Sequence, residues 1–538
     1  MTYLLLILFI LFILFILTII VICILFHRFF RHKCIFLKKY RHNNKIIIQT
    51  MGGLGNQIFQ LCFAHALSKR NEIVLSIIKS KSIHNKDSND YYNNIFKNFQ
   101  NVDKIDPTCI ETYHEPKNNF STFNPDIIDI KNYNKFVGYF QNEKYFIDYK
   151  DDIIKLLTSN SVYDKILKFK NNSYFIHIRR GDYVNHNVHY INLDIYYSNA
   201  IKYITNIDKN PHFYIISDDV TYCKNYDVIK DINKTFYENP NEVETLYFMS
   251  LCSKGGICGN STFAWWGSYL NTNPNKIVTF PDKWINFEID NDIYYNNSAV
   301  LPTQKTEMTV VSGYWIINNK YNNKYENWFK NTLNINCPYV FFGDTETINM
   351  VKKYRKNFPT YYINCKIEEF YTYKYYDNII TDNYHCPSKE LNLIWNEKVF
   401  LIQKAKNINP FNSSFFTWID SGICIYRDKN PPTKMFPDNE KIKGLPYDKF
   451  IFTTSDSDTF KKDDIGVSNH YISGTSFMTH LNFIDSFVDI YKKYLEIYLT
   501  RKDKVYTDQI ILTLIYAENP DLFYKIGDGY GKLVEILY

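Results

Sequence analysis

The chain has 538 residues, enough for roughly two to four domains and a sizeable buried core. Its formal net charge is +6, but the basic residues form no long block except beside one apolar N-terminal segment, so the charge does not indicate nucleic-acid binding. Asn, Ile, Lys and Tyr are abundant throughout, so single Tyr and Asn residues are not treated as site signals.

The first predicted element is a transmembrane helix. Residues Tyr3–Phe26 carry no charged side chain, and a helix of this length can cross a bilayer. No small-residue cleavage site follows, which favours an uncleaved anchor over a removed signal peptide. The positive-inside rule then predicts that the rest of the chain lies on the cytosolic side, because basic residues follow the helix in a linker that ends at residue 42: Arg28, Arg31, Lys33, Lys38, Lys39 and Arg41.

Strand-like apolar runs then alternate with helical stretches, which predicts α/β layers with parallel sheets. In the first half these runs lie at 46–49, 73–77, 174–178, 213–216 and 276–280. A second series starts at 308–313, after the polar stretch 291–306, and continues at 339–344 and 415–422. We therefore predict one domain over residues 43–304 and another over residues 305–538.

A glycine-rich loop joins the first predicted strand to a helix. An apolar run enters Gly52, Gly53 and Gly55, and Asn56 is placed to cap the helix that follows. Glycines let a backbone approach a ligand, and the amides at a helix N-terminus attract phosphate. The loop matches neither the dinucleotide-binding nor the P-loop pattern, so a tight turn without a ligand is an equally good interpretation of this segment alone.

Two arginines follow the predicted strand at 174–178. Period-two alternation places His177 and Arg179 on one face, and Arg180 leads into a turn at Gly181-Asp182. A buried guanidinium without a partner costs several kcal/mol, so these side chains are not core filler. The planar fork of arginine suits a diphosphate. The alternative is a structural network of arginines and carboxylates.

A third polar cluster combines two segments. One strand ends in Ser217, Asp218 and Asp219, and Asn260, Ser261 and Thr262 precede an aromatic helix that contains Trp265 and Trp266. Short hydroxyl and amide groups at a helix start suit phosphate or sugar. Core packing is the simpler explanation for the tryptophans, and capping of a strand end is the alternative for the aspartates. Asn260 also begins an Asn-Ser-Thr acceptor triplet, where a glycan would block this site, which mildly favours a compartment without N-glycosylation.

Together these segments resemble glycosyltransferase family 11, the α-1,2-fucosyltransferases. The resemblance is carried by GGLGNQIFQ (52–60), GYFQNEKYF (138–146), HIRRGDY (177–183), ISDD (216–219) and NSTFAWWGSYL (260–270), in the order of the family. It implies a two-lobed GT-B domain of Rossmann type. It also implies GDP-fucose as donor, an acceptor such as terminal galactose, inversion at the anomeric carbon, and no metal.

The resemblance also implies roles for single residues. Arg179 and Arg180 would hold the donor diphosphate, with Arg180 and Asp182 as catalytic residues. His177 would face the guanine, and Ser261 and Thr262 would contact the donor's phosphates, with Asn260 as a further donor-binding residue. Gly53, Gly55 and Asn56 would line the cleft from the other lobe. Asp218 and Asp219 are weaker donor ligands. The general base stays open between Asp182 and Glu143.

The second half resembles the HtrL/WlaTC-type bacterial glycosyltransferases, through segments such as FFTWIDSGI (415–423) and YTDQIIL (506–512). The resemblance implies a single-sheet GT-A domain in which Asp420 binds a metal, with Mn²⁺ the expected ion. Lys404 would meet a phosphate, and Asp508 would be the catalytic base or an acceptor ligand. The alternatives are a turn cap for Asp420 and a helix N-cap for Asp508. Asp456 and Asp458 form an Asp-x-Asp triplet, ranked lower because no buried strand is predicted before it.

Three functions are compatible with this layout. The chain is a bifunctional enzyme that adds two sugars, an active first domain fused to a glycan-binding module, or a structural membrane protein without activity. The intact pair of arginines argues against the third. The donor is also open, because fucose and another deoxy sugar differ by small pocket changes worth ~1–3 kcal/mol. The predicted partners are thus a nucleotide sugar, a glycan acceptor and a membrane, with no nucleic acid.

Overall fold

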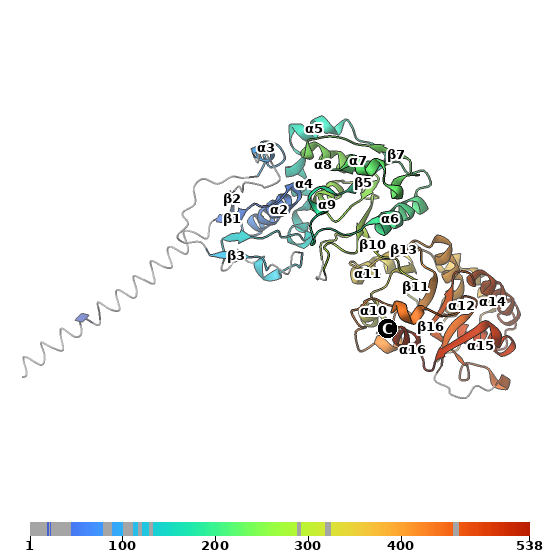
Figure 1. Ribbon diagram of the computed structural model, residues 1–538. Helices are drawn as coiled ribbons and strands as arrows, with labels where there is room; N and C mark the ends of the chain where they lie inside the picture. Colours follow the sequence, from blue (N-terminus) through green and yellow to red (C-terminus); the bar gives the residue numbers. More distant parts are fainter. Residues whose placement is uncertain are drawn as a thin grey trace, which may run out of the picture.

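The computed structural model describes residues 45–78, 89–99, 111–116, 121–128, 133–287, 292–317, 324–455 and 462–538, together with Ile19, Ile20 and Ile22. Within this part of the chain every sheet is covered by helices, so the fold is α/β. Figure 1 shows the two domains, one coloured blue to green and the other yellow to red. The strand series therefore restarts at the place where the sequence predicts a second domain.

No helix among the described residues is long and apolar enough to cross a membrane. The predicted transmembrane helix, Tyr3–Phe26, and the basic linker fall outside the described residues apart from three isoleucines. The anchor therefore stays a prediction.

The first lobe of the first domain is a parallel sheet with strand order β2-β1-β4-β3. Its strands are β1 (Lys45–Gln49), β2 (Val74–Ile78), β3 (Thr112–His114) and β4 (Lys135–Val137). Helix α2 (Leu54–Arg70) follows β1 directly, and the short helix α3 (Asn89–Asn93) follows β2. Most of α2 is buried because it packs against β1 on one side and against the second lobe on the other.

The second lobe is a six-stranded parallel sheet with order β10-β9-β8-β5-β6-β7. Its strands are β5 (Tyr174–Ile178), β6 (Phe213–Ser217), β7 (Lys234–Phe236), β8 (Gly255–Ile257), β9 (Ile277–Pro281) and β10 (Ser298–Leu301). The helices are α4 (Lys150–Thr158), α5 (Ser161–Leu167), α6 (Asp194–Ile207), α7 (Val220–Lys224), α8 (Glu242–Leu251) and α9 (Thr262–Tyr269). Strand β5 lies near the middle and all five of its residues are buried, as expected for a parallel sheet covered on both faces.

The second domain is built on one mixed sheet with order β13-β12-β11-β14-β16-β15-β17, in which β16 runs antiparallel to its neighbours. The strands are β11 (Met308–Gly313), β12 (Tyr339–Gly343), β13 (Thr360–Asn364), β14 (Phe415–Ile419), β15 (Phe450–Thr454), β16 (Ile472–His480) and β17 (Phe523–Gly527). The helices are α10 (Tyr325–Thr332), α11 (Thr345–Tyr354), α12 (Lys389–Ile408), α13 (Asn439–Ile442), α14 (Ile484–Tyr498), α15 (Asp508–Glu518) and α16 (Lys532–Leu537). The sheets change between β10 and β11, so the predicted boundary near residue 305 falls in this link.

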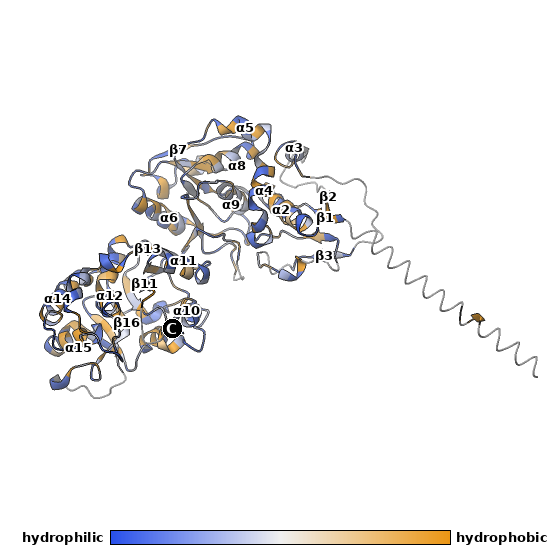
Figure 2. Ribbon diagram, turned by 180° about the vertical axis from the view of Figure 1, so that it is seen from behind, coloured by the Kyte–Doolittle hydropathy of each residue, from blue (hydrophilic) through white to orange (hydrophobic). Residues whose placement is uncertain are grey.

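Helix α14 has one buried face, whereas α2, α8 and α9 are buried over most of their length. Figure 2 shows hydrophobic and hydrophilic colours alternating along many of the helices. Trp265 and Trp266 are fully buried and pack on Phe59 with ring centroids 4.5 and 5.0 Å away, so they are core residues. The domains meet where β10 lies beside β13, and the ring of Tyr203 packs on that of Tyr361 at 4.9 Å. The interface is therefore partly apolar.

Candidate functional site

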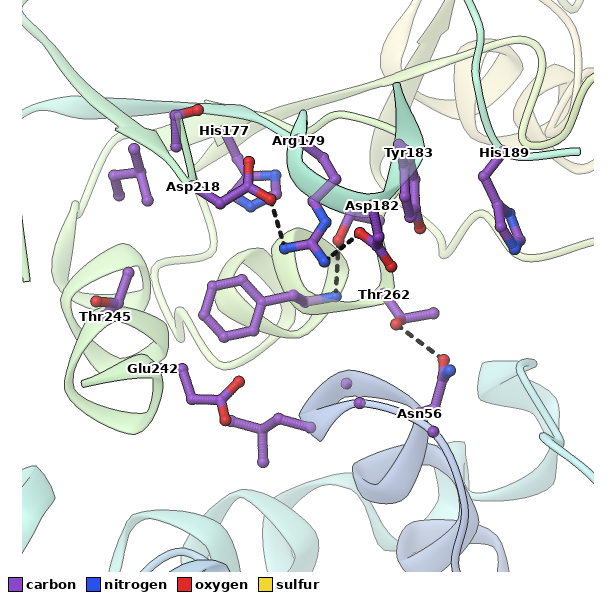
Figure 3. Close-up of a pocket in the computed structure, with 18 of the residues that line it drawn as sticks. Asn56, His177, Arg179, Asp182, Tyr183, His189, Asp218, Glu242, Thr245 and Thr262 are labelled. Carbon is purple, nitrogen blue, oxygen red and sulfur yellow. Dashed lines mark hydrogen bonds and ion pairs between the residues drawn. The ribbon is translucent and has the colours of Figure 1, made fainter. Parts of the chain in front are cut away.

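A cleft of about 720 Å³ lies between the two lobes of the first domain. Figure 3 shows side chains from both lobes pointing into it. Of the residues predicted as donor ligands or catalytic groups, the cleft brings together Gly53, Gly55, Asn56, His177, Arg179, Asp182, Asp218, Ser261 and Thr262. Arg180, Asp219 and Asn260 are not among its lining residues.

Two helices begin at the cleft, one from each lobe. A Cβ atom built on Gly55 would lie 2.5 Å from the backbone carbon of Thr262, so α2 and α9 start in direct contact. Asn56 Oδ1 accepts hydrogen bonds from Thr262 Oγ1 and from Gln141 Nε2, both at 2.9 Å. The predicted cap is wrong: Gly53 is the N-cap of α2, and Asn56 instead joins the lobes. Two helix N-termini at one cleft create a region that attracts anions.

Arg179 follows β5 and reaches into the cleft. Its guanidinium pairs with Asp182 Oδ1 at 2.5 Å and with Asp218 Oδ2 at 2.8 Å, as Figure 3 shows. The side chain is 31% exposed. Arg179 thus belongs to a carboxylate network, which was the structural alternative, and the network itself forms part of the cleft wall. An incoming anion would compete with these carboxylates for the same fork.

Arg180 does not line the cleft with Arg179. Its guanidinium lies 3.8 Å from the ring centroid of Tyr222, and it lines a neighbouring cavity of about 90 Å³, which Arg179 also lines. The backbone turns after β5, and Asp218 Oδ1 accepts a hydrogen bond from the Arg180 amide at 2.8 Å. This turn and the stacking on Tyr222 direct the second arginine away from the cleft. The expectation of two arginines at one diphosphate is therefore corrected to one.

Asp219 and Asn260 have structural contacts. Asp219 caps α7 by accepting from the amide of Tyr222 at 3.0 Å, which is the strand-end alternative. Asn260 is 4% exposed, and its amide nitrogen donates to the carbonyls of His189 and Trp284. A side chain held in this way fixes the loop before α9 and does not face the donor cleft. Ser261 accepts from the amide of Phe263 and is the N-cap of α9.

Glu143, one of the two candidate bases, does not lie in the cleft. It is 4% exposed and accepts a hydrogen bond from the amide of Asn296 at 2.9 Å. Lys356 of the second domain approaches it to 3.8 Å and approaches Asp292 to 3.6 Å. Burial raises its pKa. Glu143 therefore stabilises the contact between the domains, which leaves Asp182 as the candidate base in the cleft.

Several cleft residues were not predicted as ligands or catalytic groups. Tyr183 and His189 stack with ring centroids 5.0 Å apart at one end of the cleft. Glu242 and Thr245 project from α8 at the other end (Figure 3), and Phe263 also lines the cleft. These positions come from elements far apart in the chain, so only the fold brings them together.

His177 is buried beside Arg179, and this environment keeps its ring neutral. Desolvation, and then the charge of Arg179, lower the pKa of His177 to about 3. Its Nδ1 has no hydrogen-bond partner among the described residues. His177 therefore lines the cleft as a neutral ring, while the unpartnered Nδ1 itself is buried.

This pKa predicts a pH-dependent stability. In the unfolded chain the ring titrates near ~6.5, so below that pH the unfolded state binds a proton that the folded state does not. The free energy of unfolding is expected to fall by about 2 kcal/mol between pH 7 and pH 5 because of this group alone. Urea unfolding of the first domain in the full chain at both pH values measures it. His177→Gln should reduce the pH effect by that amount, and an unchanged pH effect would contradict the burial of a neutral ring.

A second cavity, of about 670 Å³, lies in the second domain. Asp420 and Asp508, predicted separately, both line it. Lys398 of α12 is 3% exposed and lies between them, 3.1 Å from Asp420 Oδ1 and 3.0 Å from Asp508 Oδ2. The helix-cap alternative for Asp508 is wrong, because Thr507 caps α15. Lys404, predicted as the phosphate ligand, is absent from this cavity and lies 3.9 Å from Glu397.

The residues around Asp420 do not fit the expected Mn²⁺. Asp420 Oδ1 accepts from the indole nitrogen of Trp418 at 2.7 Å, and the ammonium of Lys398 occupies the space between the carboxylates. No group of three or more His, Cys, Asp or Glu side chains suited to a metal occurs among the described residues. Asp456 and Asp458 lie outside those residues. The expectation that no buried strand precedes this triplet is wrong, however, because the buried strand β15 ends just before it.

Family comparisons agree with the division into two halves. Residues 30–297 match glycosyl transferase family 11, and residues 364–536 match a family described as a bacterial protein of unknown function, HtrL_YibB. Both resemblances noted in the sequence are thereby confirmed.

Two curated relatives match the first half. An α-1,2-colitosyltransferase of Escherichia coli is 25% identical over 279 residues, which cover 45% of this chain and 93% of the relative. The O-antigen biosynthesis glycosyltransferase WbnK of Escherichia coli is 27% identical over 282 residues, covering 43% and 92%. Among solved structures, the fucosyltransferase NodZ from Bradyrhizobium is 10% identical with a TM-score of 0.27, covering 42% of this chain and 91% of that one. A family 9 glycosyl transferase from Veillonella parvula is also 10% identical with a TM-score of 0.28, covering 49% and 88%.

Proposed function

We propose that the first domain, in a chain whose residues 30–297 match glycosyl transferase family 11, transfers fucose from GDP-fucose to a galactose-type hydroxyl by the α-1,2 linkage, with inversion. That the chain is a glycosyltransferase follows from the family match and its relatives. The donor, the linkage and the GT-B arrangement of the lobes belong to the proposal. The observation that carries it is Arg179 beside two helix N-termini at one cleft.

The transfer reaction makes defined demands on this cleft. The acceptor oxygen forms a bond to the anomeric carbon while the bond from that carbon to the diphosphate breaks, through an oxocarbenium-like state. Negative charge grows on the leaving diphosphate, and Arg179 with the amides that begin α2 and α9 would stabilise it. If the diphosphate takes the fork of Arg179, Asp182 is released from its ion pair. That carboxylate is then available to accept the proton of the acceptor hydroxyl.

The acidic end of the cleft supports a guanine nucleotide. Glu238 and Glu242 both line the cleft, and Figure 3 shows Glu242 on α8, away from Asp182. A carboxylate can accept hydrogen bonds from both the N1–H and the N2 amino group of guanine, whereas uracil offers a single N–H donor between two carbonyls. A carboxylate-lined subsite therefore favours GDP over UDP. His177, neutral and with Nδ1 unused, lies next to the same cleft and remains the proposed contact to the nucleotide.

A different sugar is the second candidate for the same site. One relative is named as a colitosyltransferase, so colitose in place of fucose is the alternative with an observation behind it. Both candidates use the same diphosphate contacts and differ only where the cleft meets the sugar ring.

The full chain is proposed to be bifunctional and anchored in a membrane, with both domains on the cytosolic side. The cavity around Asp420 supports a second transferase with a GT-A-like domain, because its carboxylates lie at strand and helix ends beside an open cavity. The alternative, a domain that only binds glycan, uses the same cavity.

A donor screen on the full chain tests the first proposal. Release of nucleotide is measured for GDP-fucose, GDP-colitose, GDP-mannose and several UDP-sugars, each with a galactose-terminated acceptor. We expect release of GDP from GDP-fucose or GDP-colitose at a rate at least tenfold above that with GDP-mannose. Release from UDP-sugars alone would refute the assignment, provided that it persists in the Asp420→Ala variant, which disables the second cavity.

A further inference from the structure

The second cavity contains a buried ion triad. The ammonium of Lys398 forms ion pairs with both carboxylates and donates a hydrogen bond to the carbonyl of Gly474 at 2.8 Å, so its charge is balanced inside the protein. A divalent cation held by Asp420 and Asp508 would have to share this space with a positive charge that is 3% exposed. Coulomb repulsion at such a distance is large where water is excluded. The triad therefore takes the place of the expected metal site.

All three members of the triad line the cavity, and Asp420 is the most exposed of them. Asp420 Oδ1 accepts a hydrogen bond from the indole nitrogen of Trp418 and forms an ion pair with Lys398. Because the Asp420 side chain is 30% exposed, Oδ2 is left for a ligand. Tyr325 and Trp395 also line the cavity. A carboxylate that accepts from hydroxyl groups, next to aromatic rings, is suited to a sugar and not to a phosphate.

A basic hollow adjoins this cavity. It encloses about 600 Å³ and is lined by four cations, Lys324, Lys330, Arg427 and Lys429, against one carboxylate, Asp428. Arg427 lines both the hollow and the cavity, and its guanidinium stacks on Trp328 with 4.0 Å to the ring centroid. Its Nε donates to the carbonyl of Gly422 at 3.4 Å, and a planar guanidinium of this kind suits oxyanions. Sugar-binding and phosphate-binding groups therefore meet at Arg427.

We propose that the second domain binds a nucleotide sugar without a divalent metal, with the sugar against Asp420 and the diphosphate at Arg427 and the basic hollow. Lys398 holds the carboxylates in place, and Arg427 supplies the positive charge that a metal ion would otherwise bring to the diphosphate. This inference rests on the proposal that the second domain is a transferase, and it gives that site a ligand class and a metal requirement.

The test uses the full chain with Arg179→Ala, which removes the cation of the first cleft. Binding of UDP-glucose, UDP-galactose, UDP-N-acetylglucosamine, GDP-mannose and dTDP-glucose is measured in EDTA and again in Mn²⁺. We expect at least one probe to bind with a Kd that agrees within twofold between the two conditions. Adding the Arg427→Ala substitution should raise the Kd of that probe at least tenfold. Lys404→Ala also removes one cation, but outside both cavities, and should leave the Kd unchanged.

The possible outcomes distinguish this inference from the proposal that the second domain is a transferase. Binding that appears only with Mn²⁺ would overturn the metal-free site while the second transferase stands. Binding that Arg427→Ala does not weaken would overturn the placement of the diphosphate. No binding of any probe in either condition would overturn the second transferase as well. Urea unfolding of the Arg427→Ala chain should follow the same curve as that of its parent, which shows that a weaker Kd does not reflect a misfolded second domain.

Discussion

Replacing Arg179 by alanine is expected to lower kcat for sugar transfer by ~10²–10³-fold, the usual cost of removing one donor to a developing anion. Arg179 is the only Lys or Arg among the described residues that line the first cleft. In a cleft without a second cation, the charge on the departing diphosphate has no other side chain to balance it. Steady-state release of GDP from the preferred donor measures the effect.

Two matched variants make this prediction specific. Arg179→Lys keeps the charge but loses the planar fork, so it should recover part of the rate and not all of it. Arg180→Ala removes the neighbouring guanidinium, which stacks on Tyr222 outside the cleft, and should cost less than tenfold. A loss in Arg180→Ala as large as that in Arg179→Ala would show that the second arginine reaches the donor after all.

Replacing Gly55 by alanine is expected to destabilise the first domain by about 1–3 kcal/mol, the range for overpacking a close contact. The new methyl group would lie 2.5 Å from the backbone carbon and 2.7 Å from the backbone oxygen of Thr262. The backbone of Thr262 cannot rotate aside as a side chain can, so the lobes must separate. The hydrogen bond from Thr262 to Asn56 must then lengthen. Displacement of the two helix N-termini by about 1 Å should also cost ~10²-fold in kcat.

Gly53→Ala is the control for Gly55→Ala. A Cβ on Gly53 meets no atom within 4 Å, and its backbone has φ −71°, which any residue adopts. Its free energy of unfolding is expected to stay within about 0.5 kcal/mol of the wild type. Urea unfolding of the three proteins checks both expectations, and equal losses in the two variants would show that the lobes do not meet at residue 55.

The sequence predicts the elements of this fold better than the directions of its side chains. Strands β5 and β11 have the predicted ends, because buried parallel strands are apolar runs with sharp polar borders. Alternation along β5 also predicts that Arg179 follows His177 on one face. The alternation does not extend to Arg180, because this residue lies beyond the strand. Contacts with Asp218 and Tyr222 set the direction of the Arg180 side chain. Those partners are about 40 residues away in the chain, so no local pattern could reveal them.

The second domain shows the same limit and one missed signal. Asp420 and Asp508 were singled out separately, but the ammonium that joins them was not. Lys398 occupies a position of α12 three residues before Leu401 and seven after Leu391, on the apolar stripe of the helix. A lysine on such a stripe indicates a buried ion pair, since an unpaired buried charge is costly. Its partners still depend on the order of strands β14 and β16, which the sequence does not determine.

The central claim is that one cleft, in the first domain, binds the donor through Arg179. Release of GDP from GDP-fucose, or from GDP-colitose if that is the preferred donor, by the wild type, Arg179→Ala and Asp420→Ala full chains tests it most directly. The account predicts equal rates for the wild type and Asp420→Ala, and a rate ~10²–10³-fold lower for Arg179→Ala. A rate preserved in Arg179→Ala and lost in Asp420→Ala would move the reaction to the second domain and contradict the account.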